Sequence, residues 1–287
     1  MVLHPPEPSS YARLGQAGAR SPLVIAVPHA GRLYPPEMLA AARLPHSALE
    51  TIEDRHADLL VADAVQAGAV AIVARVARAY VDLNRDEREI DPMLLGERQA
   101  PGTWLTSPKV TGGLGAIPSR IAAGGAVWAK PLGAGEIEAR MAAAHRPYHA
   151  AIARAMDEAI AMHGIAILID CHSMPPLTGR GTGARLVVGD RHGRSAEPRF
   201  VAAAIDAAKR EGLTVARNHP YAGGHTLDRH GIPSEGRHAI QIELDRSLYL
   251  DALLRTPTDG LARARRLIAA VAVALEDEAR GQLLAAE

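Results

Sequence analysis

The stretch Gly164-Ile-Ala-Ile-Leu-Ile-Asp-Cys-His-Ser-Met-Pro175 decides the fold, because an unbroken apolar run there stops on polar side chains that can bind a metal. A short apolar run that begins after a glycine is typical of a central strand covered on both faces, as parallel sheets require. Side chains alternate along a strand, so Asp170 and His172 point to the same side. Ligands of open α/β sheets bind outside the carboxyl ends of the strands. We therefore predict a site here, although hydrogen bonds within a loop would also satisfy both side chains.

Three further apolar runs end in polar side chains in the same way. In parallel strands, such ends meet at one edge of the sheet, and this convergence is what an α/β fold with a single active-site edge produces. The runs and their polar groups are 22–27 with His29, 69–81 with Asn84 and Arg85, and 238–244 with Glu243. The second is interrupted by Arg75 and Arg78, so it forms either one edge-like strand or two short ones.

The periodicity of the remaining chain completes an α/β pattern in one domain. We predict an N-terminal arm over residues 1–21 and a single domain over residues 22–287. Two more short strands are expected at 185–190 and 213–216, and helices at 48–67, 135–163, 196–210 and 259–279. Residues 91–135 are rich in Pro and Gly, and so long a connection is better interpreted as an excursion that covers or shapes a pocket.

The composition excludes several classes of function. The chain has 287 residues, of which 48% are hydrophobic, and its 32 basic residues balance 32 acidic ones. This balance gives no electrostatic footprint for nucleic acid or for an anionic membrane surface, so we expect a small-molecule partner. Cys171 is the single cysteine, which excludes a disulfide framework and fits a reducing cytoplasm. No apolar run is long enough for a membrane span, and nothing indicates an oligomeric state.

The acidic first half of the predicted helix 48–67 has two interpretations. In the first, its charged side chains form a solvated face near a helix N-terminus, where negative charge is favoured. In the second, one of its carboxylates completes a site with His29. The polar residues concerned are Glu50, Glu53, Asp54, His56 and Asp58.

Other polar groups also allow a structural and a functional interpretation. Asn84 and Arg85 offer planar donors suited to a carboxylate, but Arg85 would equally form a surface ion pair with the acids that follow it. The pair Gly223-Gly224 suggests backbone that passes close to another group. Glu243, within an apolar strand, is costly unless it is paired or functional.

Three histidines near these glycines resemble a metal cluster in their number. Their spacings of six and five fit neither a helical pair nor a zinc finger, so we interpret them as solvated loop residues. They are His219, His225 and His230.

The residues at the strand ends match one type of chemistry. Two histidines and a carboxylate make a catalytic zinc site, a second carboxylate makes a general base, and an arginine with an asparagine makes a carboxylate clamp. The sequence contains no Gly-rich phosphate loop and no Gly-x-Ser-x-Gly nucleophile motif. Metal-assisted hydrolysis is the reaction class that the residues favour.

The chain also resembles a known family, over about residues 22–251. The likeness is carried by Val-Pro-His-Ala-Gly at 27–31, Glu-Asp-Arg-His-Ala-Asp at 53–58, Val-Asp-Leu-Asn-Arg at 81–85, Gly-Leu-Gly-Ala-Ile-Pro at 113–118, Asp-Cys-His-Ser-Met-Pro at 170–175, Val-Gly-Asp-Arg-His-Gly at 188–193, Asn-His-Pro-Tyr-Ala-Gly-Gly at 218–224 and Ile-Glu-Leu-Asp-Arg-Ser-Leu-Tyr at 242–249. These motifs are similar to those of the N-formylglutamate amidohydrolases, whose fold is similar to that of the zinc carboxypeptidases. The resemblance implies a three-layer α/β/α fold around a mixed, mostly parallel sheet.

The resemblance also implies roles for individual residues. Zinc would be held by His29, His172 and a carboxylate placed at Asp54, with Glu53 as the alternative. Glu243 would act as the general base, and Arg85 would serve both catalysis and substrate binding. Asn84, Arg85, Gly223 and Gly224 would contact the substrate.

The expected activity is zinc-dependent hydrolysis of N-formyl-L-glutamate to formate and L-glutamate, a step in histidine breakdown. A hydrolase of another N-acyl amino acid, or of a C-terminal peptide bond, is the alternative within enzymes. A non-catalytic binding protein for an acidic ligand is the alternative of a different class, and the intact His29, His172 and Glu243 argue against it. Any substrate should carry a free carboxylate.

Overall fold

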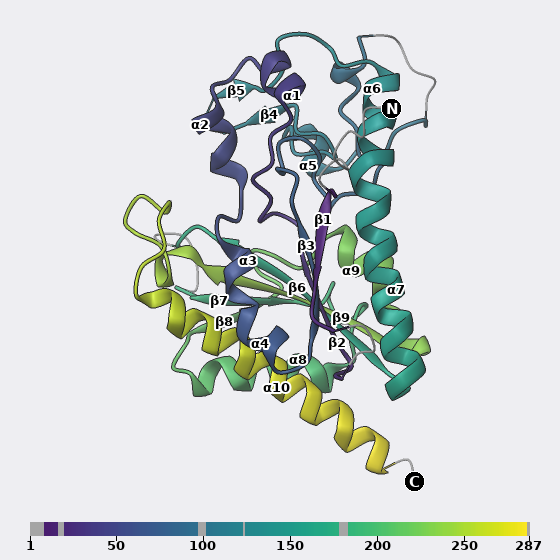
Figure 1. The fold of residues 1–287 in the computed structure, drawn as a ribbon, viewed down its shortest axis with the longest axis vertical. Coiled ribbons are helices and arrows are strands. Elements are labelled where there is room, and N and C mark those ends of the chain that lie inside the picture. The colour runs from purple at the N-terminus through teal and green to yellow at the C-terminus, as the bar shows by residue number, and fades with distance from the viewer. Residues whose placement is uncertain (1–8, 17–19, 97–101, 123, 178–182, 286–287) are drawn as a thin grey trace, which may run out of the picture.

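A seven-stranded sheet in the order β1-β3-β2-β6-β9-β7-β8 forms the centre of the molecule (Figure 1). The structure is a computed structural model, and it describes residues 9–16, 20–96, 102–122, 124–177 and 183–285. The strands are β1 (Tyr11–Leu14), β2 (Leu23–Val27), β3 (Val70–Ala74), β6 (Ala166–Met174), β7 (Leu186–Gly189), β8 (Val215–Arg217) and β9 (Arg237–Asp245).

The sheet is mixed and mostly parallel, as predicted. Strands β3, β2, β6 and β9 run parallel to one another, so their carboxyl ends meet at one edge. Strand β7 is antiparallel to β9, and β8 is parallel to β7. Strands β2, β3 and β6 of this block are buried on both faces, which explains why each has a continuous apolar run rather than an alternating pattern.

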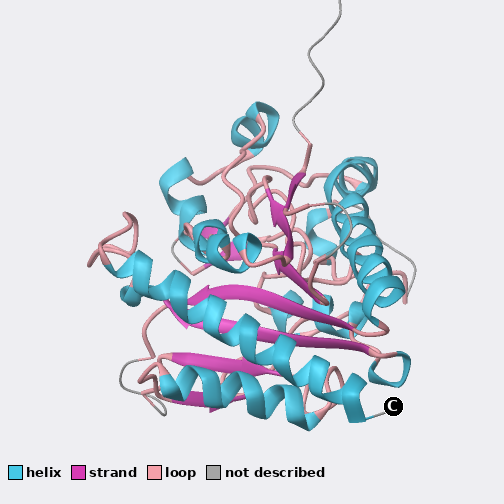
Figure 2. Ribbon diagram, turned by 60° about the horizontal axis from the view of Figure 1, so that its bottom comes forward, coloured by secondary structure: helices cyan, strands magenta, loops and turns pink. Residues whose placement is uncertain are grey.

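Helices cover both faces of the sheet and give the predicted three layers. Helix α7 packs on one face, where Ile152 and Met156 meet alternate residues of the central strands. Helices α8 and α10 pack on the other face through residues such as Phe200 and Leu275, and Figure 2 shows the C-terminal helix running across the strands. The helices of these layers are α3 (Ala57–Leu60), α4 (Ala62–Gln66), α7 (Arg146–His163), α8 (Pro198–Arg210), α9 (His225–His230) and α10 (Gly260–Ala285).

Shorter elements gather beyond the sheet, in the upper part of Figure 1. They include the predicted excursion over residues 91–135, of which residues 97–101 and 123 lie outside the described part of the chain. Lys109 of this region lines the main cavity described below, as the excursion interpretation requires. The elements are α1 (Pro36–Ala41), α2 (His46–Leu49), η1 (Glu50–Ile52), η2 (Pro92–Leu94), α5 (Pro108–Thr111), β4 (Arg120–Ile121), β5 (Gly125–Ala126), α6 (Ala134–Arg140) and the π-helical turn η3 (Met141–His145), with η4 (Pro233–Glu235) and η5 (Arg246–Leu248) flanking β9.

The helix predicted over residues 48–67 is wrong as a single element. The chain forms α2, η1, α3 and α4 in turn, with a break at residues 53–56 where Glu53 is extended and His56 has a φ of 62°. The break is stabilised from outside the segment, because the Asp54 backbone N–H donates to the carbonyl of His29 at 2.9 Å. Tertiary hydrogen bonds thus override the helical periodicity.

Part of the predicted N-terminal arm belongs to the sheet. Residues Tyr11–Leu14 form β1, which pairs antiparallel with β3 along its outer side. Among the described residues, no helix is long and apolar enough to cross a membrane.

The two central strands are longer than their apolar runs. Strand β6 continues through Asp170 and His172 to Met174, and β9 continues through Glu243 to Asp245. His172 and Glu243 are paired in register across these strands. Asp170, His172 and Glu243 therefore lie within the final residues of β6 and β9, rather than in loops beyond the strands. They lie on the face of the sheet that carries α7 and α9.

Candidate active site

Two histidines and one aspartate meet at the carboxyl edge of the parallel strands. The Nδ1 atom of His172 lies 3.1 Å from Nδ1 of His29 and 2.9 Å from Oδ2 of Asp54. Nδ1 of His29 lies 3.4 Å from the same carboxylate oxygen. We call His29, Asp54 and His172 the metal triad, because each offers one ligand atom and all three are buried.

The other ring nitrogen of each histidine is fixed by a buried aspartate. Nε2 of His29 lies 2.8 Å from Asp82 Oδ1, and Nε2 of His172 lies 2.9 Å from Asp170 Oδ2. A carboxylate accepts hydrogen bonds, so each Nε2 donates and each Nδ1 is directed at the centre of the triad. Histidines that bind metals are oriented in this way.

The donor set fits a divalent metal such as zinc. Tetrahedral ligands about 2.0–2.2 Å from one ion lie roughly 3.3–3.6 Å apart, close to the separations within the triad. Burial would lower the pKa of His172, but the Asp170 charge and hydrogen bonds to Asp170 and Asp54 raise it well above 6.5. A site that attracts a proton this strongly also attracts a metal cation, which would take the proton's place.

Asp54, and not Glu53, faces the two histidines. Its Oδ1 accepts a hydrogen bond from Arg246 Nη2 at 2.7 Å, while Oδ2 is directed at the triad. Burial would raise the pKa of Asp54, but the hydrogen bonds to His172 and His29 lower it well below 3.8. Glu53 points elsewhere and accepts hydrogen bonds from Tyr34 at 2.5 Å and from Arg55 at 2.8 Å.

Glu243 lies beside the triad with a carboxyl group suited to proton transfer. It is 9% exposed, lines the same cavity and accepts a hydrogen bond from Gln241 Nε2 at 3.1 Å. Burial raises its pKa to about 7, against the attraction of His172, and the negative charge of Asp54 adds to the rise. A carboxyl group with a pKa near neutrality can both accept and return a proton.

A cavity of about 350 Å³ opens in front of these residues, and four cationic side chains line it. Two of them are neutralised, since Arg78 pairs with Asp82 and Arg246 pairs with Asp54. The other two are Arg85 and Lys109, for which no carboxylate of the described residues lies within ion-pair distance. Burial, together with the charges of Arg85 and Arg78, lowers the pKa of Lys109.

Arg85 is held by backbone rather than by an acid. Its Nε donates to the carbonyl of Leu114 at 3.1 Å, and its Nη1 donates to the carbonyl of Asn84 at 2.8 Å. The surface ion pair considered from the sequence is therefore absent among the described residues. The guanidinium keeps its charge available to the cavity.

Asn84 is buried in the wall of the cavity and has internal partners. Its Nδ2 donates to Asp170 at 3.2 Å and lies 3.1 Å from His172 Nε2, while its Oδ1 accepts from the Thr226 backbone N–H at 2.9 Å. A Cβ added to Gly224 would lie 2.5 Å from Asn84 Oδ1, so this close approach requires a glycine. Gly223 also lines the cavity, with a φ of 105° that L-residues rarely adopt.

Three contributors to the site had no assigned role in the sequence prediction. Asp82 and Arg246 each lie within a quoted motif and act on the triad through one hydrogen bond. Lys109 is carried by the excursion, and only its high Pro and Gly content signalled that the segment reaches the site.

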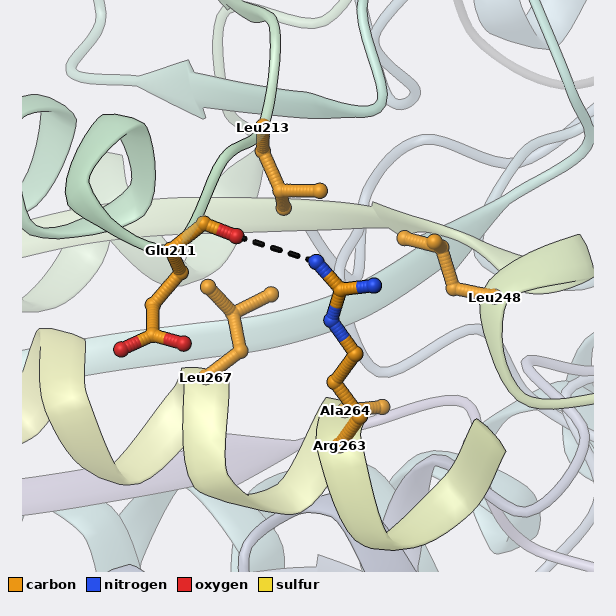
Figure 3. Close-up of a pocket in the computed structure, with 6 residues that line it drawn as sticks. All are labelled: Glu211, Leu213, Leu248, Arg263, Ala264 and Leu267. Atoms are coloured by element: carbon orange, nitrogen blue, oxygen red, sulfur yellow. Dashed lines mark hydrogen bonds between the residues drawn. The ribbon is translucent and has the colours of Figure 1, made fainter. Parts of the chain in front are cut away.

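A second hollow, of about 20 Å³, lies between α10 and the end of α8 (Figure 3). Leucines and an alanine line much of it, and Arg263 donates to the carbonyl of Glu211 at its rim at 3.2 Å. It offers no group for catalysis.

The family model for N-formylglutamate amidohydrolase matches residues 21–250 of this chain, most of its length. The chain belongs to the N-formylglutamate amidohydrolase family. The match begins just before β2 and ends just after Glu243 and Arg246, so it includes every residue of the metal triad.

Members of the N-formylglutamate amidohydrolase family with known names or structures are similar over most of their length. The N-formylglutamate deformylase of Pseudomonas aeruginosa is 30% identical over 240 residues, which cover 81% of this chain and 83% of the relative. That of Pseudomonas putida is 29% identical over the same shares. The crystal structure of N-formylglutamate amidohydrolase from Ralstonia eutropha superimposes with a TM-score of 0.87 at 30% identity, covering 96% of this chain and 99% of the other.

Proposed function

We propose that this protein hydrolyses the N-formyl amide of N-formyl-L-glutamate to formate and L-glutamate. The observation that carries the proposal is one cavity that combines the metal triad, Glu243 with a pKa of about 7, and two cations without acidic partners. The names of the Pseudomonas relatives support the same substrate.

His29, Asp54 and His172 would hold one zinc ion per chain. Zinc bound there supplies a Lewis acid that polarises the formyl carbonyl and makes water more acidic. Asp82 and Asp170 fix the ring orientation of the two histidines, and Arg246 fixes Asp54.

Glu243 would serve as base and then as acid. It accepts a proton from the water that attacks the formyl carbon, and it later returns that proton to the amide nitrogen as the C–N bond breaks. Water adds to the carbonyl, the amine leaves, and formate and glutamate are the products. A carboxyl group with a pKa near 7 is suited to both transfers.

Arg85 and Lys109 would bind the two carboxylates of the substrate. A dicarboxylate needs two cationic partners, and these are the two cavity cations that the protein does not neutralise with its own acids. Arg85 offers a planar fork that matches a carboxylate with two parallel hydrogen bonds, whereas Lys109 acts as a point charge. The backbone of Gly223 and Gly224 would line the substrate, while Asn84 contributes mainly by positioning α9 and Asp170, the partner of His172.

A panel of substrates tests this assignment. Formate or acyl release is measured for N-formylglutamate, its diamide, N-formylalanine and N-acetylglutamate. We expect N-formylglutamate to have the highest kcat/KM, because only it combines the small acyl group with two carboxylates. A preference for another acyl group would identify the protein as a hydrolase of a different N-acyl amino acid, and no turnover with bound ligand would identify a binding protein.

Variants of Arg85 identify the clamp. Truncation of one side of a buried charge pair costs about 2–5 kcal/mol in kcat/KM, so Arg85→Ala should lose most of the preference for the acid over the diamide. Arg85→Lys should raise KM more than it lowers kcat if the contact only positions the substrate. An unchanged preference in Arg85→Ala would place the clamp elsewhere.

The proposal includes a cytoplasmic role in histidine breakdown. Glutamate formed from an N-formyl derivative is consistent with that pathway, and the single buried thiol of Cys171 is compatible with a reducing compartment.

A further inference from the structure

A second group of histidines lies behind the wall of the active-site cavity. It consists of His145 in η3, His149 in α7, and His225 and His230 in α9, and we call these four residues the histidine cluster. The ring centroids of His145, His149 and His225 lie 4.6–5.7 Å apart. His149 also stacks on His230 at 5.3 Å. The prediction that His225 and His230 are solvated loop residues is wrong, because both lie on α9 and His230 is buried.

Backbone carbonyls fix the protonation of two of these rings. Nε2 of His145 lies 2.8 Å from the carbonyl oxygen of Arg85, and Nε2 of His149 lies 2.8 Å from that of Leu83. Carbonyl oxygens only accept, so each Nε2 carries a hydrogen and each neutral ring presents the lone pair of Nδ1. The same arrangement orients histidines that bind metals.

Two buried ring nitrogens of the cluster have no hydrogen-bond partner. They are Nδ1 of His145, a fully buried residue, and Nε2 of His225. Buried polar atoms are rarely left without a partner, so two unpaired ring nitrogens within one cluster of imidazoles favour a bound species between the rings. The potential ligand atoms of His145, His149 and His225 lie within 4.8 Å of one another.

The four histidines are also held in the form that binds metals. Burial lowers the pKa of His225 to about 4 and of His230 to about 3, and it lowers those of His145 and His149 as well. Neutral imidazole is the ligand form. His145 ends a π-helical turn, a distortion that is frequent at functional sites.

We propose that His145, His149 and His225 form a second, non-catalytic site for a divalent transition-metal ion such as zinc. The Nδ1 atom of His149 also lies 3.0 Å from His230 Nε2. When the ion binds His149, His230 would lose this hydrogen bond or stay next to the site without binding the ion. The ion would tie the helix of His145 and His149 to α9. The same histidines contact the carbonyls of Leu83 and Arg85, so the ion would also brace the segment that carries the proposed substrate clamp.

The first test counts zinc in a chain that lacks the metal triad. The full-length variant His29→Ala/His172→Ala is stripped with a chelator, loaded with a small excess of zinc chloride, freed of unbound zinc by gel filtration, and assayed for metal. We expect about one zinc per chain. Adding His145→Gln and His225→Gln should reduce this to almost none, whereas adding the exposed His46→Gln should change nothing. Equal zinc content with and without the cluster substitutions would overturn the proposal.

The second test needs no variant, so it holds even if a substituted chain fails to fold. Crystals of the unmodified protein soaked in zinc should give an anomalous difference peak between His145 Nδ1 and His225 Nε2. Density there without an anomalous signal would identify a water molecule and overturn the metal site. Both tests detect zinc at the histidine cluster independently of zinc at the metal triad. Zinc at the cluster but not at the triad would therefore contradict the proposed function and still support this inference.

Discussion

In the metal triad Nε2 of each histidine donates to a buried aspartate, whereas in the histidine cluster Nε2 of His145 and of His149 donates to a backbone carbonyl. The triad region contains the carboxylates of Asp54, Asp82, Asp170 and Glu243, against two arginines that contact them. No carboxylate of the described residues lies within ion-pair distance of the cluster.

The two environments shift the pKa of a histidine side chain in opposite directions. Burial lowers the pKa of His149 well below 6.5, and its histidine neighbours lower it further. Burial acts on His172 too, but Asp170 more than offsets it and the pKa rises well above 6.5. The charge of the neighbours, rather than the histidines themselves, therefore decides how strongly each site attracts a cation. We expect the triad to bind zinc more tightly and to fill first when zinc is limiting.

The largest effect should come from His172→Ala, which removes a ligand from the centre of the triad. Formate release should fall to background, because the metal depends on this ligand. Zinc content should fall only by the triad's share, since the cluster is untouched. The exposed His46→Gln is the matched control, and near-normal turnover of His172→Ala would exclude a catalytic triad.

A smaller loss, of about 10²–10⁴-fold in kcat, is expected for Glu243→Gln. The amide fills the same space but cannot accept the proton of the attacking water. Zinc content and the melting temperature should stay close to those of the wild type. The exposed Glu235→Gln serves as the control, and a Glu243→Gln enzyme with ordinary kcat would make Glu243 a structural residue.

Asp170→Asn tests whether the aspartates distinguish the two sites. Loss of an outer partner of a metal-binding histidine typically weakens metal affinity by about 10–100-fold. Competition with a chelator should detect that loss at the triad and leave the zinc of the cluster unaffected. Equal affinity before and after the change would mean that the carboxylate neighbours do not set the difference between the sites.

The smallest effect on catalysis should come from His149→Leu. This change leaves the carbonyl of Leu83 and Nε2 of His230 without a partner, at a cost of about 1–3 kcal/mol in the free energy of unfolding. Urea denaturation measures this loss of stability. The rate of formate release by the folded variant should stay close to that of the wild type. A loss of activity as large as that of His172→Ala would show that the two sites are not separable.

The sequence predicted the sheet better than the connections. The central strands and the convergence of His29, His172 and Glu243 followed from apolar runs and from the rule that parallel strands end at one edge. The break at residues 53–56 could not be predicted in this way. It depends on the hydrogen bond that the Asp54 N–H donates to the carbonyl of His29, and on the contacts of the Asp54 carboxylate with His172 and with the donating Arg246. Local periodicity contains no information about such distant partners.

The histidine cluster was missed for a related reason. His149 and His230 are 81 residues apart, and their contact arises only when α7 and α9 pack together. A local signal was nevertheless present. His145 and His149 are separated by four residues within the predicted helix 135–163, a spacing that places both side chains on one face.

Strand β1 has a consequence for solubility during folding and storage. It covers the outer side of β3, whose five residues Val70–Ala74 are all apolar and buried. Without β1, that row of backbone donors and acceptors would become an open sheet edge, which is a template for pairing between chains. The opposite edge is protected differently, because β8 is only three residues long. A chain shortened to begin at Ser21 should therefore keep its catalytic groups but aggregate at concentrations where the full-length protein stays dispersed.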